Sequence, residues 1–161
     1  ACVETLWGHD CVVVALEVDW AAQRAVSAGQ DRTLKLWDLE RAACVETLRG
    51  QGDPISCIAV DWPRQRALSG AANGDLKACV ETLWGHDCVV VALEVDWAAQ
   101  RAVSAGQDRT LKLWDLERAA CVETLRGQGD PISCIAVDWP RQRALSGAAN
   151  GDLKACVETL W

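Results

Sequence analysis

Residues 27–38 read SAGQDRTLKLWD, and the same stretch returns without change at residues 104–115. It belongs to a longer repeat, because residues 1–77 recur identically as residues 78–154, and residues 155–161 begin a third copy. Self-similarity at a fixed period is typical of solenoids and propellers, in which each repeat buries its apolar face against a neighbour. The repeat is therefore the first guide to the fold.

Each 77-residue block contains a second, weaker repeat. Residues 1–35 align without gaps with residues 43–77, but the first unit continues with LWDLERA and has 42 residues, whereas the second has 35. We read residues 1–161 as one repeat domain with full units at 1–42 and 78–119, truncated units at 43–77 and 120–154, and the start of a further unit at 155–161.

The full unit reads as four short strands separated by polar turns, at Val3–Leu6, Val13–Val18, Arg24–Ser27 and Thr33–Leu39. Short strands at a spacing of roughly ten residues indicate antiparallel, all-β structure. In the truncated unit the last turn is Asn73-Gly74, a strong hairpin signal because both central positions of a type I′ turn need positive φ.

Gly8-His9, an interval of 27 residues and then Trp37-Asp38 resemble the signature of the WD-repeat β-propeller family, and the second block repeats the pattern. The resemblance implies an all-β fold, a β-propeller-like arc of four-stranded antiparallel blades with ACVETL as the outer strand of the preceding blade. Two blades are full and two truncated, whereas propellers have about four to eight blades of about 40–45 residues. We expect an incomplete ring, completed by further chain of a longer propeller or by a second copy in a homo-oligomer.

The resemblance also implies a buried hydrogen-bonded tetrad in each full blade, carried over by position to His9, Ser27, Asp31, Trp37, His86, Ser104, Asp108 and Trp114. An indole only donates, a hydroxyl relays, a neutral imidazole does both and a carboxylate only accepts, so such a chain leaves no member unpaired. The same side chains could form a Ser-His-Asp catalytic triad, but a hydroxyl held inside a blade does not face a cleft. We expect no catalytic residues and no enzyme.

The truncated unit departs from this pattern in a correlated way. Gln51 stands in place of His9 and Asn73 in place of Asp31, so no buried charge is left unpaired, and Ser69 remains. Deletion of LWDLERA joins the start of the third strand directly to ACVETL. The chain must then cross over, leave a strand unpaired or build an irregular three-stranded unit, and the residues do not choose among these.

Partners of this family commonly dock on the loops beside the Gly-His pair and the hairpin turns. Here those positions hold Asp10, Cys11, Gln30, Arg32, Asp87, Cys88, Gln107 and Arg109. The resemblance implies a non-catalytic protein–protein interaction scaffold that binds a protein or peptide and needs no cofactor. The alternative is a self-assembling structural or designed repeat module without an external ligand.

Composition excludes several other classes. A net charge of −7 with scattered basic residues argues against nucleic acid. The longest apolar run, Cys11–Leu16, is far shorter than the roughly 20 residues of a membrane helix, and the first residues do not resemble a signal peptide. His9-Asp10-Cys11 has no second ligand cluster nearby, so we expect no metal site.

The nine cysteines alternate with apolar residues and never occur at CxxC spacing. We interpret them as small buried apolar residues of an intracellular, cytoplasmic protein in a reducing compartment.

Two further sets of residues have open roles. Glu17 and Glu94 lie in the most apolar strand and either contact water at an edge or channel, or bind a basic partner. A second set follows Asp at the strand ends and either packs between blades or anchors a partner: Trp20, Trp62, Trp97 and Trp139.

Overall fold

The computed structural model describes residues 5–49, 51–78, 82–126 and 128–156. All regular structure in these residues is β-strand, as the turn spacing predicts. No helix in the described part of the chain is long and apolar enough to cross a membrane.

The first full unit forms a four-stranded meander, which we call sheet 1. Its strands are β1 (Val13–Asp19), β2 (Arg24–Gly29), β3 (Leu34–Asp38) and β4 (Ala43–Leu48), each antiparallel to the next. The ACVETL segment is β4 and therefore completes the sheet of the preceding unit, as the family resemblance implies. Thr5 and Leu6, from the segment expected to form the first strand, are not in a strand, and Val3 and Glu4 lie outside the described residues.

The second full unit builds sheet 3 in the same way. Its strands are β9 (Val90–Asp96), β10 (Arg101–Gly106), β11 (Leu111–Asp115) and β12 (Ala120–Leu125). The registers agree with those of sheet 1: Trp37 lies opposite Ala25 and Cys44, and Trp114 lies opposite Ala102 and Cys121. Identical sequence therefore gives identical local structure in the two copies.

The truncated units also form sheets. Sheet 2 consists of β5 (Ile55–Asp61), β6 (Arg66–Ala71), β7 (Leu76–Ala78) and β8 (Thr82–Leu83). Leu76 pairs with Leu83 and Lys77 with Thr82, so the ACVETL segment is divided between the end of the third strand and a short fourth strand. The missing residues are accommodated by shortening the two outer strands rather than by a crossover.

Sheet 4 is the copy of sheet 2 and has three strands within the described residues. These are β13 (Ile132–Asp138), β14 (Arg143–Ala148) and β15 (Leu153–Cys156). Here the third strand continues to Cys156, whereas its counterpart β7 ends at Ala78.

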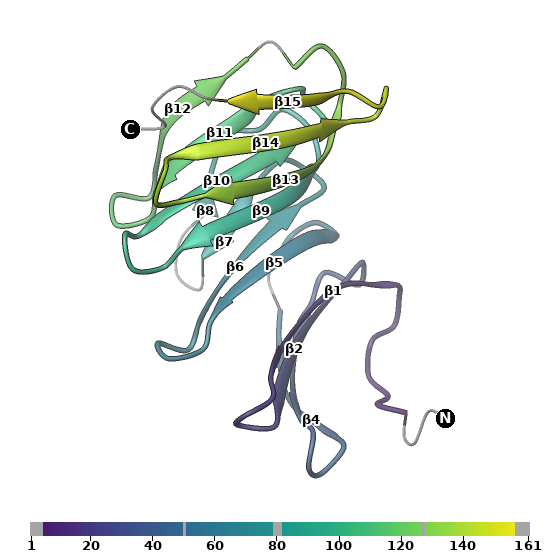
Figure 1. Ribbon diagram of the computed structural model, residues 1–161. Coiled ribbons are helices and arrows are strands. Elements are labelled where there is room, and N and C mark those ends of the chain that lie inside the picture. The colour runs from purple at the N-terminus through teal and green to yellow at the C-terminus, as the bar shows by residue number, and fades with distance from the viewer. Residues whose placement is uncertain (1–4, 50, 79–81, 127, 157–161) are drawn as a thin grey trace.

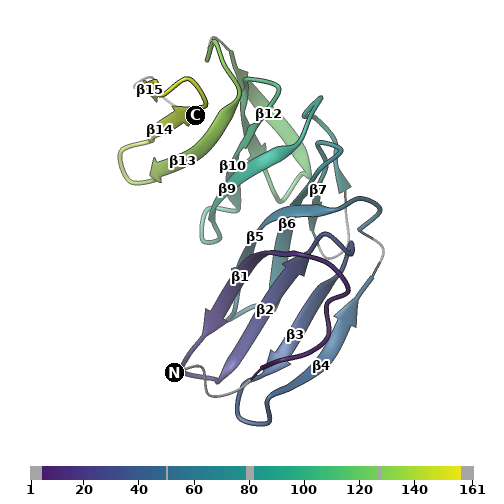
Figure 2. The same cartoon turned by 90° about the vertical axis from the view of Figure 1, so that its right-hand side faces the viewer.

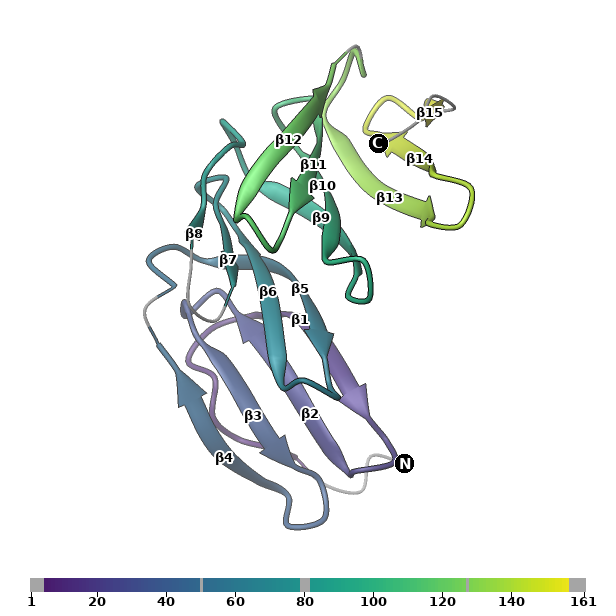
Figure 3. The same ribbon diagram turned by 90° about the vertical axis from the view of Figure 1, so that its left-hand side faces the viewer.

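The four sheets are stacked in chain order as an open arc (Figures 1 and 2). The first strands of the sheets are the innermost: β5 contacts both β1 and β9, and β9 contacts β13. Sheet 1 and sheet 4 lie at the two ends of the stack, as Figure 3 shows most clearly. Each end sheet therefore has a neighbour on one face only.

The core lies between successive sheets rather than inside any one of them. Sheets 1 and 2 bury Leu34 against Ile55 and Ile58, and sheets 3 and 4 bury Leu111 against Ile132. The largest contribution between sheets 2 and 3 comes from Leu68, Leu76, Leu83, Val90, Ala102 and Trp114. Burial of this apolar area is the main favourable term holding the arc together.

Most of the cysteines with described side chains lie outside this core, and the expectation that they are buried is wrong for these; Cys57 packs against the cluster between sheets 2 and 3. Of the cysteines whose side chains are described, Cys11, Cys44, Cys121 and Cys134 are exposed, and Cys57 and Cys88 are partly buried. Cys44 and Cys121 are exposed because β4 and β12 are outer strands. Cys2, Cys79 and the side chain of Cys156 lie outside the described part.

Candidate functional site

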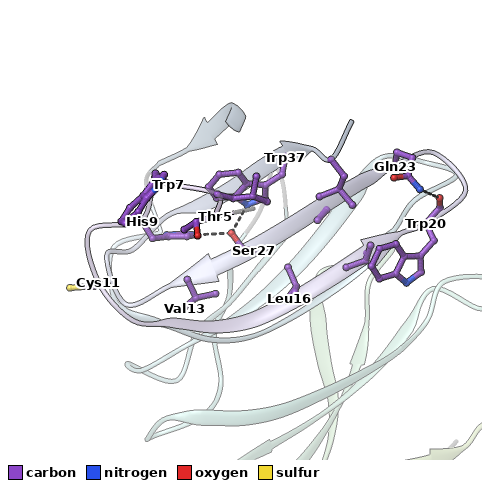
Figure 4. A pocket seen from close by; sticks show the side chains of 15 residues that line it. Thr5, Trp7, His9, Cys11, Val13, Leu16, Trp20, Gln23, Ser27 and Trp37 are labelled. Carbon is purple, nitrogen blue, oxygen red and sulfur yellow. Dashed lines mark hydrogen bonds between the residues drawn. The ribbon is translucent and has the colours of Figure 1, made fainter. Parts of the chain in front are cut away.

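In sheet 1, a chain of hydrogen bonds links β3, β2, the loop before β1 and the β2–β3 hairpin. The indole Nε1 of Trp37 on β3 donates to Ser27 Oγ on β2 at 2.7 Å. Ser27 Oγ lies 2.6 Å from His9 Nε2, and His9 Nδ1 lies 2.7 Å from Asp31 Oδ2 in the β2–β3 hairpin. Figure 4 shows the first part of this chain, from Trp37 through Ser27 to His9.

Sheet 3 contains the same arrangement, more deeply buried. Trp114 Nε1 donates to Ser104 Oγ at 2.7 Å, Ser104 Oγ lies 2.7 Å from His86 Nε2, and His86 Nδ1 lies 2.7 Å from Asp108 Oδ2. The structure thus brings together all eight residues to which the family resemblance assigns a tetrad.

The glycine of the Gly-His pair has a steric reason. A Cβ added to Gly8 would lie 2.9 Å from Cη2 of Trp37, and one added to Gly85 would lie 2.7 Å from the same atom of Trp114. Only glycine allows the loop to approach the indole closely enough for the next residue, histidine, to reach the serine. The Gly-His and Trp-Asp pairs, which are far apart in the sequence, therefore contact each other in the folded sheet.

Donor and acceptor chemistry gives the chain a direction. Because the indole only donates, Ser27 Oγ accepts from Trp37 and passes its own hydrogen to His9 Nε2. In the neutral tautomer that fits this direction, His9 accepts at Nε2 and donates from Nδ1 to Asp31. In sheet 3, burial lowers the pKa of His86 although the neighbouring Asp108 raises it, which favours the same neutral form.

The carboxylate at the end of the chain remains ionised. Burial raises the pKa of Asp31, but hydrogen bonds from Thr33, His9 and the amide of Asp10 outweigh it and lower the pKa to about 2. Burial likewise raises the pKa of Asp108, and the equivalent contacts again outweigh it and lower that pKa. These carboxylates are thus anions stabilised by hydrogen bonds at the base of their loops.

The threonine two residues after each aspartate was not anticipated from the sequence. Thr33 Oγ1 donates to Asp31 Oδ1 at 2.7 Å and its amide donates to the same oxygen at 3.1 Å, and Thr110 repeats both bonds to Asp108. The Asp-x-Thr spacing in QDRT is the signal that could have indicated this turn.

The truncated units replace the tetrad with a simpler pair. Ser69 Oγ donates to Gln51 Oε1 at 3.0 Å, and Ser146 Oγ donates to Gln128 Oε1 at 2.8 Å. The serine and the residue at the histidine position therefore remain hydrogen-bonded without an indole, and the pair carries no charge.

The serine, histidine and aspartate of each tetrad have the distances of a nucleophilic triad, yet their surroundings differ from an active site. The hydroxyl of Ser27 also accepts a bond from Trp37, and Ser27 and Ser104 are 3% and 0% exposed. Ser27 and His9 lie at a hollow on the outer face of sheet 1, but Ser27 Oγ there is held between Trp37 and His9. The arrangement is suited to holding loops in place.

Eight exposed or partly exposed residues lie on the loops that the tetrads hold. The loops before β1 and within the β2–β3 hairpin are joined by Gln30 N donating to Val12 O at 2.9 Å and by Asp10 N donating to Asp31 Oδ2 at 3.0 Å. Sheet 3 repeats both contacts. We call this surface the loop rim; it comprises Asp10, Cys11, Gln30, Arg32, Asp87, Cys88, Gln107 and Arg109.

Two other sets of candidates have distinct positions. Glu17 on β1 and Glu94 on β9 are partly buried, burial raises the pKa of each, and the charge of Glu17 further raises the pKa of Glu94. Trp62 and Trp97 pack between sheets, with the guanidinium carbons of Arg24 and Arg66 at 5.2 and 5.4 Å from their ring centroids.

Within the described ranges, no group of three or more His, Cys, Asp or Glu could hold a metal ion.

The stacked antiparallel sheets and the Trp-Ser-His-Asp chain define a β-propeller-like repeat protein. The family model described as "WD domain, G-beta repeat" matches residues 1–38 and 77–115, which supports a WD-repeat family. No curated protein matches the sequence. Among solved structures, the crystal structure of the computationally designed Ika4 protein is similar, with a TM-score of 0.79, 23% identity and coverage of 94% of each chain, which is a likeness of fold.

Proposed function

We propose that this protein is a non-catalytic scaffold that binds a protein or peptide on the loop rim. The observation that carries the proposal is the link between each tetrad and the loops above it. Asp31 accepts from both His9 and the amide of Asp10, so the buried chain ends at the surface where a partner would dock. A rigid rim lowers the entropy cost of binding.

The net charge of the whole chain favours a partner with basic side chains, whereas the rim itself is mixed, with Arg32 and Arg109 beside its two aspartates. The chain has a net charge of −7, and the exposed Asp10 and Asp87 occupy equivalent places in the two full sheets. Glu17 on β1 and Glu94 on β9, which lie outside the loop rim, repel each other, and a cation near them would relieve that repulsion. Such complementarity raises association rates and selects among partners.

The test is binding of the chain to an immobilised library of lysine- and arginine-containing peptides, followed by pull-down from a cell extract. We expect Asp10→Ala combined with Asp87→Ala to weaken binding of the selected peptides about tenfold, because rim charges contribute modestly each. The side chains are exposed, so the variant should fold as the parent does.

Glu40→Ala combined with Glu117→Ala is the matched control. Both glutamates are exposed in the β3–β4 and β11–β12 turns, at the edge of the sheets opposite the loop rim, and the charge change is identical. Equal loss of binding in both double variants would show that net charge alone matters and would contradict a rim site.

We also propose a reducing compartment, the cytoplasm, as the location. Cys11, Cys44, Cys57, Cys88, Cys121 and Cys134 are free, and free exposed thiols persist where the glutathione pool is reducing.

The second candidate function is a self-assembling repeat module. It is favoured by the two end faces of the arc, whose counterparts in the interior are buried.

A further inference from the structure

The same residues are buried in one copy of the repeat and exposed in the other. Val90 of sheet 3 is 0% exposed against sheet 2, whereas Val13, its equivalent in sheet 1, is 49% exposed. Leu68 of sheet 2 is 1% exposed against sheet 3, whereas its equivalent Leu145 in sheet 4 is 43% exposed. The outer face of sheet 1 thus corresponds to the buried face of sheet 3, and the outer face of sheet 4 corresponds to the buried face of sheet 2. Neither outer face has a neighbouring sheet in a single copy.

The free face of sheet 1 is one of these halves. It is hollowed over about 660 Å³ and lined by Val13, Leu16 and Trp20 (Figure 4), by Ala25, and by His9, Ser27 and Trp37 of the tetrad. The equivalents of Val13, Leu16, Trp20 and Ala25 in sheet 3 are Val90, Leu93, Trp97 and Ala102, all of which pack in the cluster between sheets 2 and 3.

The free face of sheet 4 is the other half. Leu153 is 71% exposed, whereas its equivalent Leu76 is 0% exposed in the interior cluster. Cys134 is exposed, whereas Cys57 packs against that cluster. A single copy therefore exposes leucines on sheet 4 and an apolar hollow on sheet 1. The interior equivalents of these two faces pack against each other between sheets 2 and 3.

Polar side chains that join sheets 2 and 3 also have equivalents at the ends of the arc, where no neighbouring sheet covers them. Arg66 lies over the ring of Trp97 and donates from Nη1 to Gln100 Oε1 at 3.0 Å. At the ends of the arc, the corresponding Arg143 is exposed, and the corresponding Trp20 is 72% exposed. Arg24 over Trp62 shows that this stacking also joins sheets 1 and 2.

We propose that sheet 4 of one molecule packs on sheet 1 of a second copy of this chain, as sheet 2 packs on sheet 3. Leu145 and Leu153 then cover the hollow of the second copy, and Arg143 stacks on Trp20 of the second copy. This contact is heterologous, since it joins two different faces, and such contacts close into rings when the rotation permits. Two copies contribute eight sheets, about the upper size of common propellers, so the assembly proposed is a closed ring of two molecules.

This inference is independent of the loop rim, because the end faces and the rim are different surfaces. A ring of two copies would carry two sets of rim loops whether or not a partner binds them. The two proposals can therefore fail separately.

The test begins with the mass of the 161-residue chain in light scattering after size-exclusion chromatography. We expect twice the 17.5 kDa of one chain at high protein concentration, with dissociation on dilution. A single-chain mass at all concentrations would overturn the proposal. So would assemblies that grow without limit, because they would show a heterologous contact that does not close.

Mixing two variants tests the pairing of faces. Leu145→Glu damages the sheet 4 face, and Leu16→Glu damages the sheet 1 face; both positions are exposed in one copy, so each variant should fold. A buried carboxylate is costly, so we expect each variant alone to dissociate about a hundredfold more readily than the parent. In the mixture, the intact sheet 4 of the Leu16→Glu molecule can pair with the intact sheet 1 of the Leu145→Glu molecule.

The mixture should therefore contain a 1:1 complex that neither variant forms alone. Failure of the two variants to complement each other would overturn the heterologous contact. Val45→Glu with Val122→Glu is the control, because these residues are 54% and 56% exposed in an end sheet and an interior sheet alike and so lie outside the interface. Loss of assembly in this control would assign the effect to charge.

Gly151 gives a second, steric test. A Cβ on its equivalent Gly74 would lie 2.2 Å from the carbonyl oxygen of His86, whereas one on Gly151 meets nothing within 4 Å in a single copy. In the proposed ring Gly151 lies against the carbonyl of His9 of the second copy, so Gly151→Ala should weaken assembly about tenfold. Gly52→Ala, at a similar positive φ and in open space, should leave it unchanged. Equal assembly of the two variants would contradict the proposed contact of the hairpin.

Discussion

At the scale of single residues, each full sheet depends on one buried polar chain whose members satisfy one another. The bond from Trp114 to Ser104 is made between residues that are both fully buried. Loss of a single partner leaves an unpaired polar group in an apolar surrounding, and that is more costly than the bond itself is worth. The tetrad is therefore more sensitive to substitution than its exposed neighbours.

Replacement of Trp37 and Trp114 by Phe removes the indole donor and keeps an aromatic ring. We expect the free energy of unfolding in urea to fall by about 1–3 kcal/mol for each site. The control is Trp7→Phe with Trp84→Phe, since these indoles are 84% and 71% exposed. Equal unfolding free energies of the tetrad variant and the parent would contradict the role proposed for the chain.

The tetrads also predict a dependence of stability on pH. The pKa values of His86 and Asp31 are lowered in the folded state, Asp31 to about 2, so the unfolded chain binds protons more readily at both groups. Stability should be complete above about pH 6.5, fall first as the unfolded histidine becomes protonated, and fall again between about pH 4 and 2.

Chemical denaturation at pH 7, 6 and 5 measures the first part of this dependence. The chain contains two histidines, so the control is His9→Gln with His86→Gln, which installs the residue that the truncated units carry at this position. We expect a flatter profile between pH 7 and 5 in this variant. If the free energy of unfolding of the parent rose between pH 7 and 5, the predicted direction of the pH dependence would be wrong.

At the scale of strands and turns, the Asn-Gly hairpin of the truncated unit connects two sheets. Gly74 has φ of +93° and approaches the loop of His86, where a Cβ has no room. We expect Gly74→Ala to lower the melting temperature more than Gly52→Ala, which has a similar backbone cost at φ of +79° in open space. Equal shifts in thermal denaturation would mean that the contact between the sheets contributes nothing.

The strands and turns could be predicted well from the sequence, whereas the burial of each strand by a neighbouring sheet could not. Turn chemistry and strand spacing predicted β1, β2 and β3 closely, and the WD resemblance predicted that β4 closes the preceding sheet. The division of ACVETL between β7 and β8 was left open, because it depends on how much chain remains rather than on strand propensity.

Exposure could not be predicted from local sequence at all. Val13 and Val90 have identical neighbours along the chain, yet one is half exposed and the other fully buried, since only sheet 3 has a neighbour on that face. The cysteines of β4 and β12 were misjudged for a similar reason: alternation indicates a strand and does not reveal that the strand is outermost.

At the scale of the whole molecule, the arc resembles a propeller with one gap. Association at that gap should make thermal stability depend on protein concentration, because any partner that binds the folded state alone stabilises it by mass action. We expect the melting temperature of the parent to rise with concentration and that of Leu145→Glu to remain constant. The same melting temperature for the parent at all concentrations would contradict association.

The division of one sequence into an interior and an end copy has a consequence for how the two copies tolerate change. In a lone arc, Leu16 can become polar at little cost while its twin Leu93 cannot, and the copies would be free to diverge. In a ring both leucines lie in equivalent junctions, and selection would act on them alike. Saturation mutagenesis of the two positions, read out by soluble yield, should therefore give nearly the same profile of accepted residues, and a permissive Leu16 beside a restrictive Leu93 would indicate that the ends stay apart.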